Sequence, residues 1–176
     1  TDDRFSIQSM SKPFAYALAI EDHGLGYVLD RVGVEPSGEA FNELSLDPET
    51  GKPRNPMINA GAIATHALVE RDRAEPVDRV LGLFSDLAQR RVEIDEALAS
   101  SELATGDRNL GLAYLLHASG RLDHDPAAAV EGYIRQCSAS VTVHDLALMA
   151  ATLANGGVQP KTGLRLFSRR TTRHVL

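Results

Sequence analysis

The sequence predicts a mostly α-helical chain. Apolar residues recur at helical spacing over most of its length, whereas only Arg4–Ile7 and Gly163–Phe167 are typical of strands. No repeat, low-complexity tract or interdomain linker interrupts the pattern. The 176 residues, 43% hydrophobic and 24% charged, are enough for one globular core. We therefore expect a single domain over residues 1–176.

The first half is expected to hold helices on both sides of a turn-rich stretch. Residues 35–56 are rich in Pro, Gly, Asp and Asn, which favour turns. The small residues Ala60–Ala62 permit close backbone approach at the start of a helix, and Pro76 is typical of a first helical turn. The expected helices are Gln8–Glu21, Leu25–Arg31, Asn59–Glu70 and Val77–Arg91.

The second half continues with helical periodicity. Asn155-Gly156-Gly157 is a typical helix end, and residues 168–176 are typical of a helix that is just beginning. The helices expected before it are Asp95–Ala104, Asn109–Ser119, Pro126–Cys137 and Val143–Ala154. No Met begins the chain, and both strand candidates lie near its ends. We therefore expect a piece of a longer domain, with most strands of any sheet outside it.

Composition excludes several functional classes. The formal net charge of −6 argues against nucleic-acid and anionic-membrane partners, which require a basic face. The longest apolar run, Phe14–Ile20, is far shorter than the ~20 residues of a membrane span. Cys137 is the single cysteine and the six histidines are scattered, so we expect no disulfide, no metal site and no cofactor. With no signal-peptide pattern, the sequence predicts a cytoplasmic protein.

Ser9-Met10-Ser11-Lys12 is the sharpest chemical signal. A serine hydroxyl becomes a good nucleophile when a base removes its proton. Residues three apart share a helix face, so the Lys12 amine can reach Ser9 and, if burial lowers its pKa, can act as that base. The start of a helix also favours developing negative charge. The alternative is a chance Ser-x-x-Lys pattern on a surface helix.

Asn55 and Asn59 flank an apolar pair that leads into a helix of small residues. This arrangement suits the wall of a pocket, where a side-chain amide meets a polar ligand. The structural alternative has Asn55 in a turn and Asn59 capping its helix, and spacing alone favours that alternative.

Glu102 and Asn109 lie on opposite sides of a turn and can face one cavity. Asp107 can cap the helix that follows, and Arg108 can pair with Asp107 or Glu102, so structural roles are sufficient for those two residues. Tyr133 lies at a helical position, where an aromatic residue usually packs in the core. Tyrosine is preferred over phenylalanine where its hydroxyl finds a partner.

Several segments together form a more specific pattern that covers nearly the whole chain. In chain order they are Phe5-Ser6-Ile7-Gln8-Ser9-Met10-Ser11-Lys12-Pro13, Glu35-Pro36-Ser37-Gly38 with Phe41-Asn42, Asn55-Pro56-Met57-Ile58-Asn59-Ala60-Gly61-Ala62-Ile63, Gly106-Asp107-Arg108-Asn109, Tyr133 with Gln136-Cys137-Ser138, and Met149-Ala150-Ala151-Thr152-Leu153-Ala154-Asn155-Gly156-Gly157. This pattern resembles the serine-dependent glutaminases. The resemblance implies an α+β, β-lactamase/transpeptidase-like fold, of which residues 1–176 hold the helical middle.

The resemblance also implies a function: hydrolysis of L-glutamine to L-glutamate and ammonia through an acyl-enzyme, by a homodimer or homotetramer. Ser9 resembles the family's nucleophile and Lys12 its activating partner. The positions that match the family's substrate contacts are Asn59, Glu102, Asn109 and Tyr133. The family's further active-site tyrosines and its Lys-Ser-Gly-Val-type strand fall outside residues 1–176. We therefore expect this piece alone to have little activity.

Two other functions share part of this pattern. Penicillin-recognising serine hydrolases share the Ser-x-x-Lys pattern, and Lys161-Thr162-Gly163 imitates their third motif. However, Pro160 follows a turn there, and the chain has no Ser-x-Asn or Tyr-x-Asn motif. The third interpretation, a non-catalytic helical module, is disfavoured because every site residue carried over above is present.

Overall fold

The structure, a computed structural model, describes residues 2–43, 46–69 and 75–176, and the predicted mostly helical chain is confirmed. A 3₁₀ helix, η1 (Gln8–Ser11), runs directly into the first α-helix. The helices are α1 (Lys12–His23), α2 (Leu25–Arg31), α3 (Asn59–Leu68), α4 (Pro76–Ala88), α5 (Glu96–Leu103), α6 (Asp107–Ala118), α7 (Pro126–Cys137), α8 (Val143–Ala154) and α9 (Arg169–Val175). Among these described residues, no helix is long and apolar enough to span a membrane.

Two of the helices whose boundaries match the prediction begin at a side-chain cap, α7 and α8. The Asp125 side chain accepts from Ala128 N, with Pro126 in the first turn of α7. Thr142 and Asp145 form a capping box at the start of α8. The predicted bounds of α2, α7 and α8 are confirmed.

Other boundaries move because of local backbone geometry. The predicted helix Gln8–Glu21 begins as a 3₁₀ turn and extends to His23. Helix α4 ends at Ala88 rather than Arg91, because Gln89 adopts a left-handed conformation with φ 57°. Helix α3 ends at Leu68; its predicted last residue, Glu70, lies outside the described residues.

A small antiparallel sheet has strands β1 (Phe5–Ser6), β2 (Glu93–Ile94) and β3 (Ala139–Val141), in the order β1-β3-β2. Only β1 falls within a predicted strand. The strand predicted at Gly163–Phe167 is wrong, because this segment makes one isolated bridge, Val158–Arg165. The Gln159 side-chain oxygen accepts from the backbone N–H groups of Lys161 and Thr162 and closes a turn there instead.

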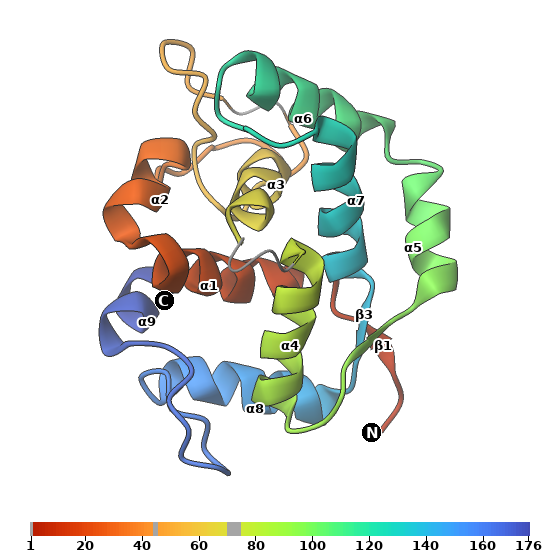
Figure 1. Ribbon diagram of the computed structural model, residues 1–176, viewed down its shortest axis with the longest axis vertical. Helices are drawn as coiled ribbons and strands as arrows, with labels where there is room; N and C mark the ends of the chain where they lie inside the picture. Colours follow the sequence, from red (N-terminus) through yellow and green to blue (C-terminus); the bar gives the residue numbers. More distant parts are fainter. Residues whose placement is uncertain (1, 44–45, 70–74) are drawn as a thin grey trace.

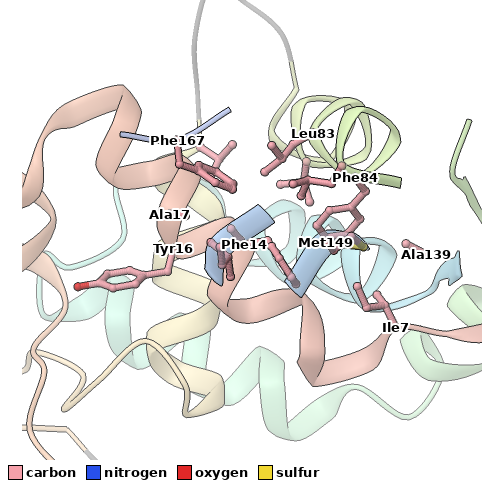
Figure 2. Close-up of a cluster of buried hydrophobic side chains, with 14 of the residues drawn as sticks. Ile7, Phe14, Tyr16, Ala17, Leu83, Phe84, Ala139, Met149 and Phe167 are labelled. Carbon is pink, nitrogen blue, oxygen red and sulfur yellow. The ribbon is translucent and has the colours of Figure 1, made fainter. Parts of the chain in front are cut away.

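Two apolar cores lie on either side of α1. The first core is formed by α1 with α4, α8 and α9. In it the rings of Phe14 and Phe84 pack edge to face with their centroids 6.2 Å apart, and Met149 and Phe167 belong to the same cluster (Figure 2). The second lies between α3, α6 and α7. Helix α1 also packs against α3, so it joins the two cores (Figure 1).

Buried His66 on α3 predicts a pH-dependent stability. The side chain is 1% exposed, and its Nδ1 lies 2.7 Å from Gln136 Oε1. Burial lowers the pKa of His66 from 6.5 to about 4; the Gln136 hydrogen bond opposes this shift, and His124 adds to it. Between those two pH values the unfolded chain binds a proton that the folded chain does not. The free energy of unfolding therefore decreases as the pH is lowered from 6.5 to about 4, by up to about 3 kcal/mol.

Urea denaturation of the full-length protein at pH 7 and pH 4.5 checks this expectation. His66→Asn removes the titrating ring and keeps an amide that can bond Gln136. We expect the variant to lose less stability than the wild type between the two pH values, because changes at other titrating groups cancel in the comparison. Equal losses would contradict it.

Candidate active site

Lys12, the first residue of α1, is the buried amine of the candidate site. Its side chain is buried, with 3% exposure, and Nζ donates to Met57 O at 2.8 Å and to Asn59 Oδ1 at 2.9 Å. The ring of Phe41 lies 5.6 Å from Nζ. Burial lowers the pKa of Lys12, although the nearby Cys137 opposes the shift. A lysine in this environment releases its proton more readily than one in water.

Asn59 links Lys12 to a second helix. Because a lysine ammonium can only donate, the Asn59 side-chain oxygen must face Lys12. Asn59 Nδ2 then donates to Asn109 Oδ1 at 3.1 Å, which turns the Asn109 nitrogen away from Asn59. One lysine therefore sets the orientation of both asparagine amides, on α3 and α6.

Tyr133 joins this group from α7. Its side chain is 3% exposed, and its hydroxyl donates to Asn59 Oδ1 at 3.4 Å. Burial, with Cys137 close by, raises the pKa of Tyr133, and a hydrogen bond with Ser9 acts in the opposite direction. The hydroxyl is therefore neutral and lies beside the predicted nucleophile.

Ser9 is exposed in η1, directly before α1. A 3₁₀ helix has three residues per turn, so residues three apart eclipse one another, and Ser9 lies one turn before Lys12. The prediction that Ser9 and Lys12 lie on one face of the helix is consistent with this geometry. Both residues are described, and no hydrogen bond joins them; Lys12 Nζ donates to Met57 and Asn59 instead. Catalytic hydrogen bonds often tighten only when substrate binds.

Glu102, in the last turn of α5, is half-buried at the edge of the group. Its Oε1 accepts from Gln8 Nε2 at 2.8 Å. Gln8, which precedes Ser9, has φ 52°, an uncommon backbone conformation for a residue other than glycine. The sequence analysis did not identify Gln8 as a site residue. The one signal that could have identified it is its position next to Ser9.

The sequence brings these helices together through small residues on α3. A Cβ atom at Gly61 would lie 1.9 Å from Asn55 O, so the backbone preceding the helix packs directly against it. Helix α3 contacts α1, α6 and α7, the helices that carry Lys12, Asn109 and Tyr133. The predicted close backbone approach is confirmed.

The structural alternatives have mixed outcomes. Asn55 does lie in a turn, where its Oδ1 accepts from the backbone N–H groups of Met57 and Ile58. The capping role that spacing favours for Asn59 is wrong, because Asn59 is the first residue of α3 and its side chain bonds Lys12 and Asn109. Arg108 pairs with Glu43 at 2.8 Å, not with Asp107 or Glu102.

Asp107 does not cap α6 either. It is the first helical residue, and the N-cap position belongs to Gly106.

Over the described ranges, no three His, Cys, Asp or Glu side chains are grouped so that they could hold a metal ion. The site thus offers a serine, a buried amine, two oriented amides, a tyrosine hydroxyl and a carboxylate, which suit acyl transfer to serine.

Comparison with known proteins identifies a family. The glutaminase family model matches residues 1–176. The glutaminase of Corynebacterium efficiens is 49% identical over 99% of this chain and 42% of its own length. That of Trichormus variabilis is 49% identical over 98% of this chain and 52% of its own length. The chain thus spans about half the length of these curated relatives.

Solved structures give the same result. The crystal structure of Mglu in its native form has a TM-score of 0.93 and 48% identity, over 99% of this chain and 43% of that one. A second Mglu structure, in its L-glutamate binding form, has a TM-score of 0.92 over 99% of this chain and 40% of that one. A probable glutaminase of Bacillus subtilis has a TM-score of 0.94 and 33% identity, over 99% of this chain and 57% of that one. The chain belongs to the glutaminase family.

Proposed function

We propose that the full-length protein hydrolyses L-glutamine to L-glutamate and ammonia through an acyl-enzyme on Ser9. The observation that carries this proposal is the buried Lys12 amine, with its lowered pKa, one helical turn from an exposed serine. Membership of the glutaminase family supports glutamine as the substrate.

In the proposed first step, the Lys12 amine takes the Ser9 proton while Ser9 Oγ bonds to the side-chain carbonyl carbon of glutamine. The C–N bond then breaks, and the nitrogen leaves as ammonia with that proton. Water next adds to the ester and gives a proton to Lys12. Ser9 Oγ leaves with this proton as glutamate is released, and serine and amine return to their starting states.

Substrate recognition follows from the charges of a free amino acid. We assign its ammonium group to the Glu102 carboxylate, and its carboxylate to the Asn109 nitrogen and the Tyr133 hydroxyl. Asn59 holds Lys12 and Asn109 in place and lies within reach of the same ligand. Mglu, 48% identical to this chain, was crystallised in an L-glutamate binding form, which supports a site for the reaction product.

The same proposal extends to the whole domain. We propose a β-lactamase/transpeptidase-like fold in which residues outside 1–176 supply most of the sheet and the remaining active-site groups. Activity must therefore be measured on the full-length protein. A homodimer or homotetramer, a cytoplasmic location and a reaction without a cofactor stay predictions.

Glu102→Gln tests the assigned ammonium site. The amide keeps the shape and the bond to Gln8 but loses the negative charge. A hydrogen bond to a charged group contributes about 1.5–3 kcal/mol, so we expect KM for glutamine to rise about 10- to 100-fold, with a smaller change in kcat. Steady-state ammonia release from the full-length protein measures both constants.

Glu96→Gln is the matched control on the same helix. Glu96 pairs with Arg135 on the exposed side of α5, and such pairs contribute little to stability. Because Glu96 is not one of the assigned substrate contacts, KM should stay at the wild-type value. An unchanged KM in Glu102→Gln would remove Glu102 from the substrate site.

Labelling of Ser9 by a fluorescent penicillin, without glutamine hydrolysis, would overturn the proposed function.

A further inference from the structure

Three fully buried polar side chains form a hydrogen-bonded series that begins at Ser11, directly before Lys12. Ser11 and Gln136 are 0% exposed and His66 is 1% exposed. His66 Nδ1 lies 2.7 Å from Gln136 Oε1, and Gln136 Nε2 donates to Ser11 Oγ at 3.0 Å. Burying polar groups costs free energy unless they are paired. Here each group has its partner only if all three side chains hold one arrangement.

The series has a consistent direction. Because Gln136 Oε1 can only accept, the His66 ring carries its hydrogen on Nδ1. Ser11 Oγ receives from Gln136 and lies 3.8 Å from Cys137 Sγ, so its own hydrogen can point to the sulfur. The His66 ring is fixed from the other side as well, since a Cβ atom at Gly132 would lie 2.3 Å from its Nε2.

Each element that supplies this series also supplies the site; two of them are α3 and α7 (Figure 1). Helix α3 carries both Asn59 and His66, separated by two turns on one side of the helix. Helix α7 carries both Tyr133 and Gln136, three residues apart and therefore on one face. The third contribution, Ser11, lies between Ser9 and Lys12 in the η1–α1 segment.

We propose that Gln136, held by His66, is a positioning residue for the reaction. Through Ser11 it fixes the turn that carries Ser9 and Lys12 against Tyr133 and Asn59. This inference rests on the proposed function. Its physical basis is the distance dependence of catalysis, since a displacement of about 1 Å at the reacting groups can cost about 100-fold in rate.

Two variants break the same link from opposite sides. Gln136→Met keeps the length of the side chain and removes both hydrogen bonds, and Ser11→Ala removes a single oxygen. In the full-length protein we expect each to lower kcat for glutamine about tenfold or more, with KM within about threefold, because the substrate contacts remain. The double variant should be little worse than the poorer single variant, since both act on one interaction.

Conservative replacement separates positioning from mere packing. His66→Asn keeps an amide near the position of Nδ1 and should retain kcat near the wild-type value, whereas His66→Leu should match Gln136→Met.

Gln159 offers a matched control for the loss of a buried glutamine. It is also 0% exposed, but its nitrogen donates to Leu87 O, away from the site. Gln159→Met should lower the melting temperature and leave kcat unchanged.

Labelling of Ser9 by a fluorophosphonate gives a readout that does not need glutamine. We expect Ser11→Ala and Gln136→Met to slow labelling in parallel with kcat. An active wild type with unchanged kcat and labelling in both variants would overturn the positioning role and leave the proposed function intact. A wild type that neither hydrolyses glutamine nor labels at Ser9 would overturn the proposed function, and the inference with it.

Discussion

Ser9→Ala in the full-length protein is expected to lower kcat for glutamine about 10⁴-fold or more, with little change in the melting temperature. The large loss follows because no acyl-enzyme can form without the hydroxyl, and loss of a nucleophile leaves only the contributions of binding and orientation. The small stability effect follows from the exposure of Ser9, since exposed substitutions usually change stability by less than about 0.5 kcal/mol.

Ammonia release and thermal unfolding measure the two quantities on the same samples. Ser100→Ala is the matched control, because Ser100 on α5 is also an exposed serine and has no part in the proposed reaction. Its kcat should equal that of the wild type.

Rapid quenching of the wild type with glutamine should trap a glutamyl adduct on the Ser9 peptide. Turnover by Ser9→Ala within tenfold of the wild type would exclude Ser9 as the nucleophile.

The helices were predictable because local signals define them. Pro126 after Asp125, Thr142 before Val143 and Gly24 after His23 each mark a boundary that the chemistry of two or three neighbouring residues decides. Strands β2 and β3 were not, because they contain only two and three residues, too few for an alternating pattern to appear. Their pairing depends on contacts between distant segments, which no local window contains.

The candidate site shows the same division. Ser9 and Lys12 are close in sequence, so their spacing alone predicts that they lie one turn apart. That Lys12 meets Asn59, and Asn59 meets Asn109, depends on how α1, α3 and α6 pack. The local pattern made Asn59 and Asn109 candidates, and the family resemblance then matched them to substrate contacts; neither predicted which side chains they would meet. His66 belonged to no recognised motif, and its contact with Gln136 follows only from the packing of α3 on α7.

Lys12→Met should separate activity from stability most clearly. We expect kcat for glutamine to fall about 1,000-fold, because a general base typically contributes 10²- to 10⁴-fold. Lys12→Arg should not restore it, since a guanidinium stays protonated at any pH at which the protein is folded. Lys52→Met is the matched control: Lys52 donates to Leu29 O, away from the site, and this variant should keep the wild-type kcat.

The stability of Lys12→Met is expected to equal or exceed that of the wild type. Burial lowers the pKa of Lys12 in the folded chain, so below that pKa folding must bury a charge that the unfolded chain leaves in water. Stability therefore rises with pH between the folded and unfolded pKa values, and the methionine variant should lack this rise. In the wild type, kcat/KM should rise with pH as the amine loses its proton, with a midpoint below 10.5. A strongly destabilised and fully active Lys12→Met would show that the lysine serves the fold rather than the reaction.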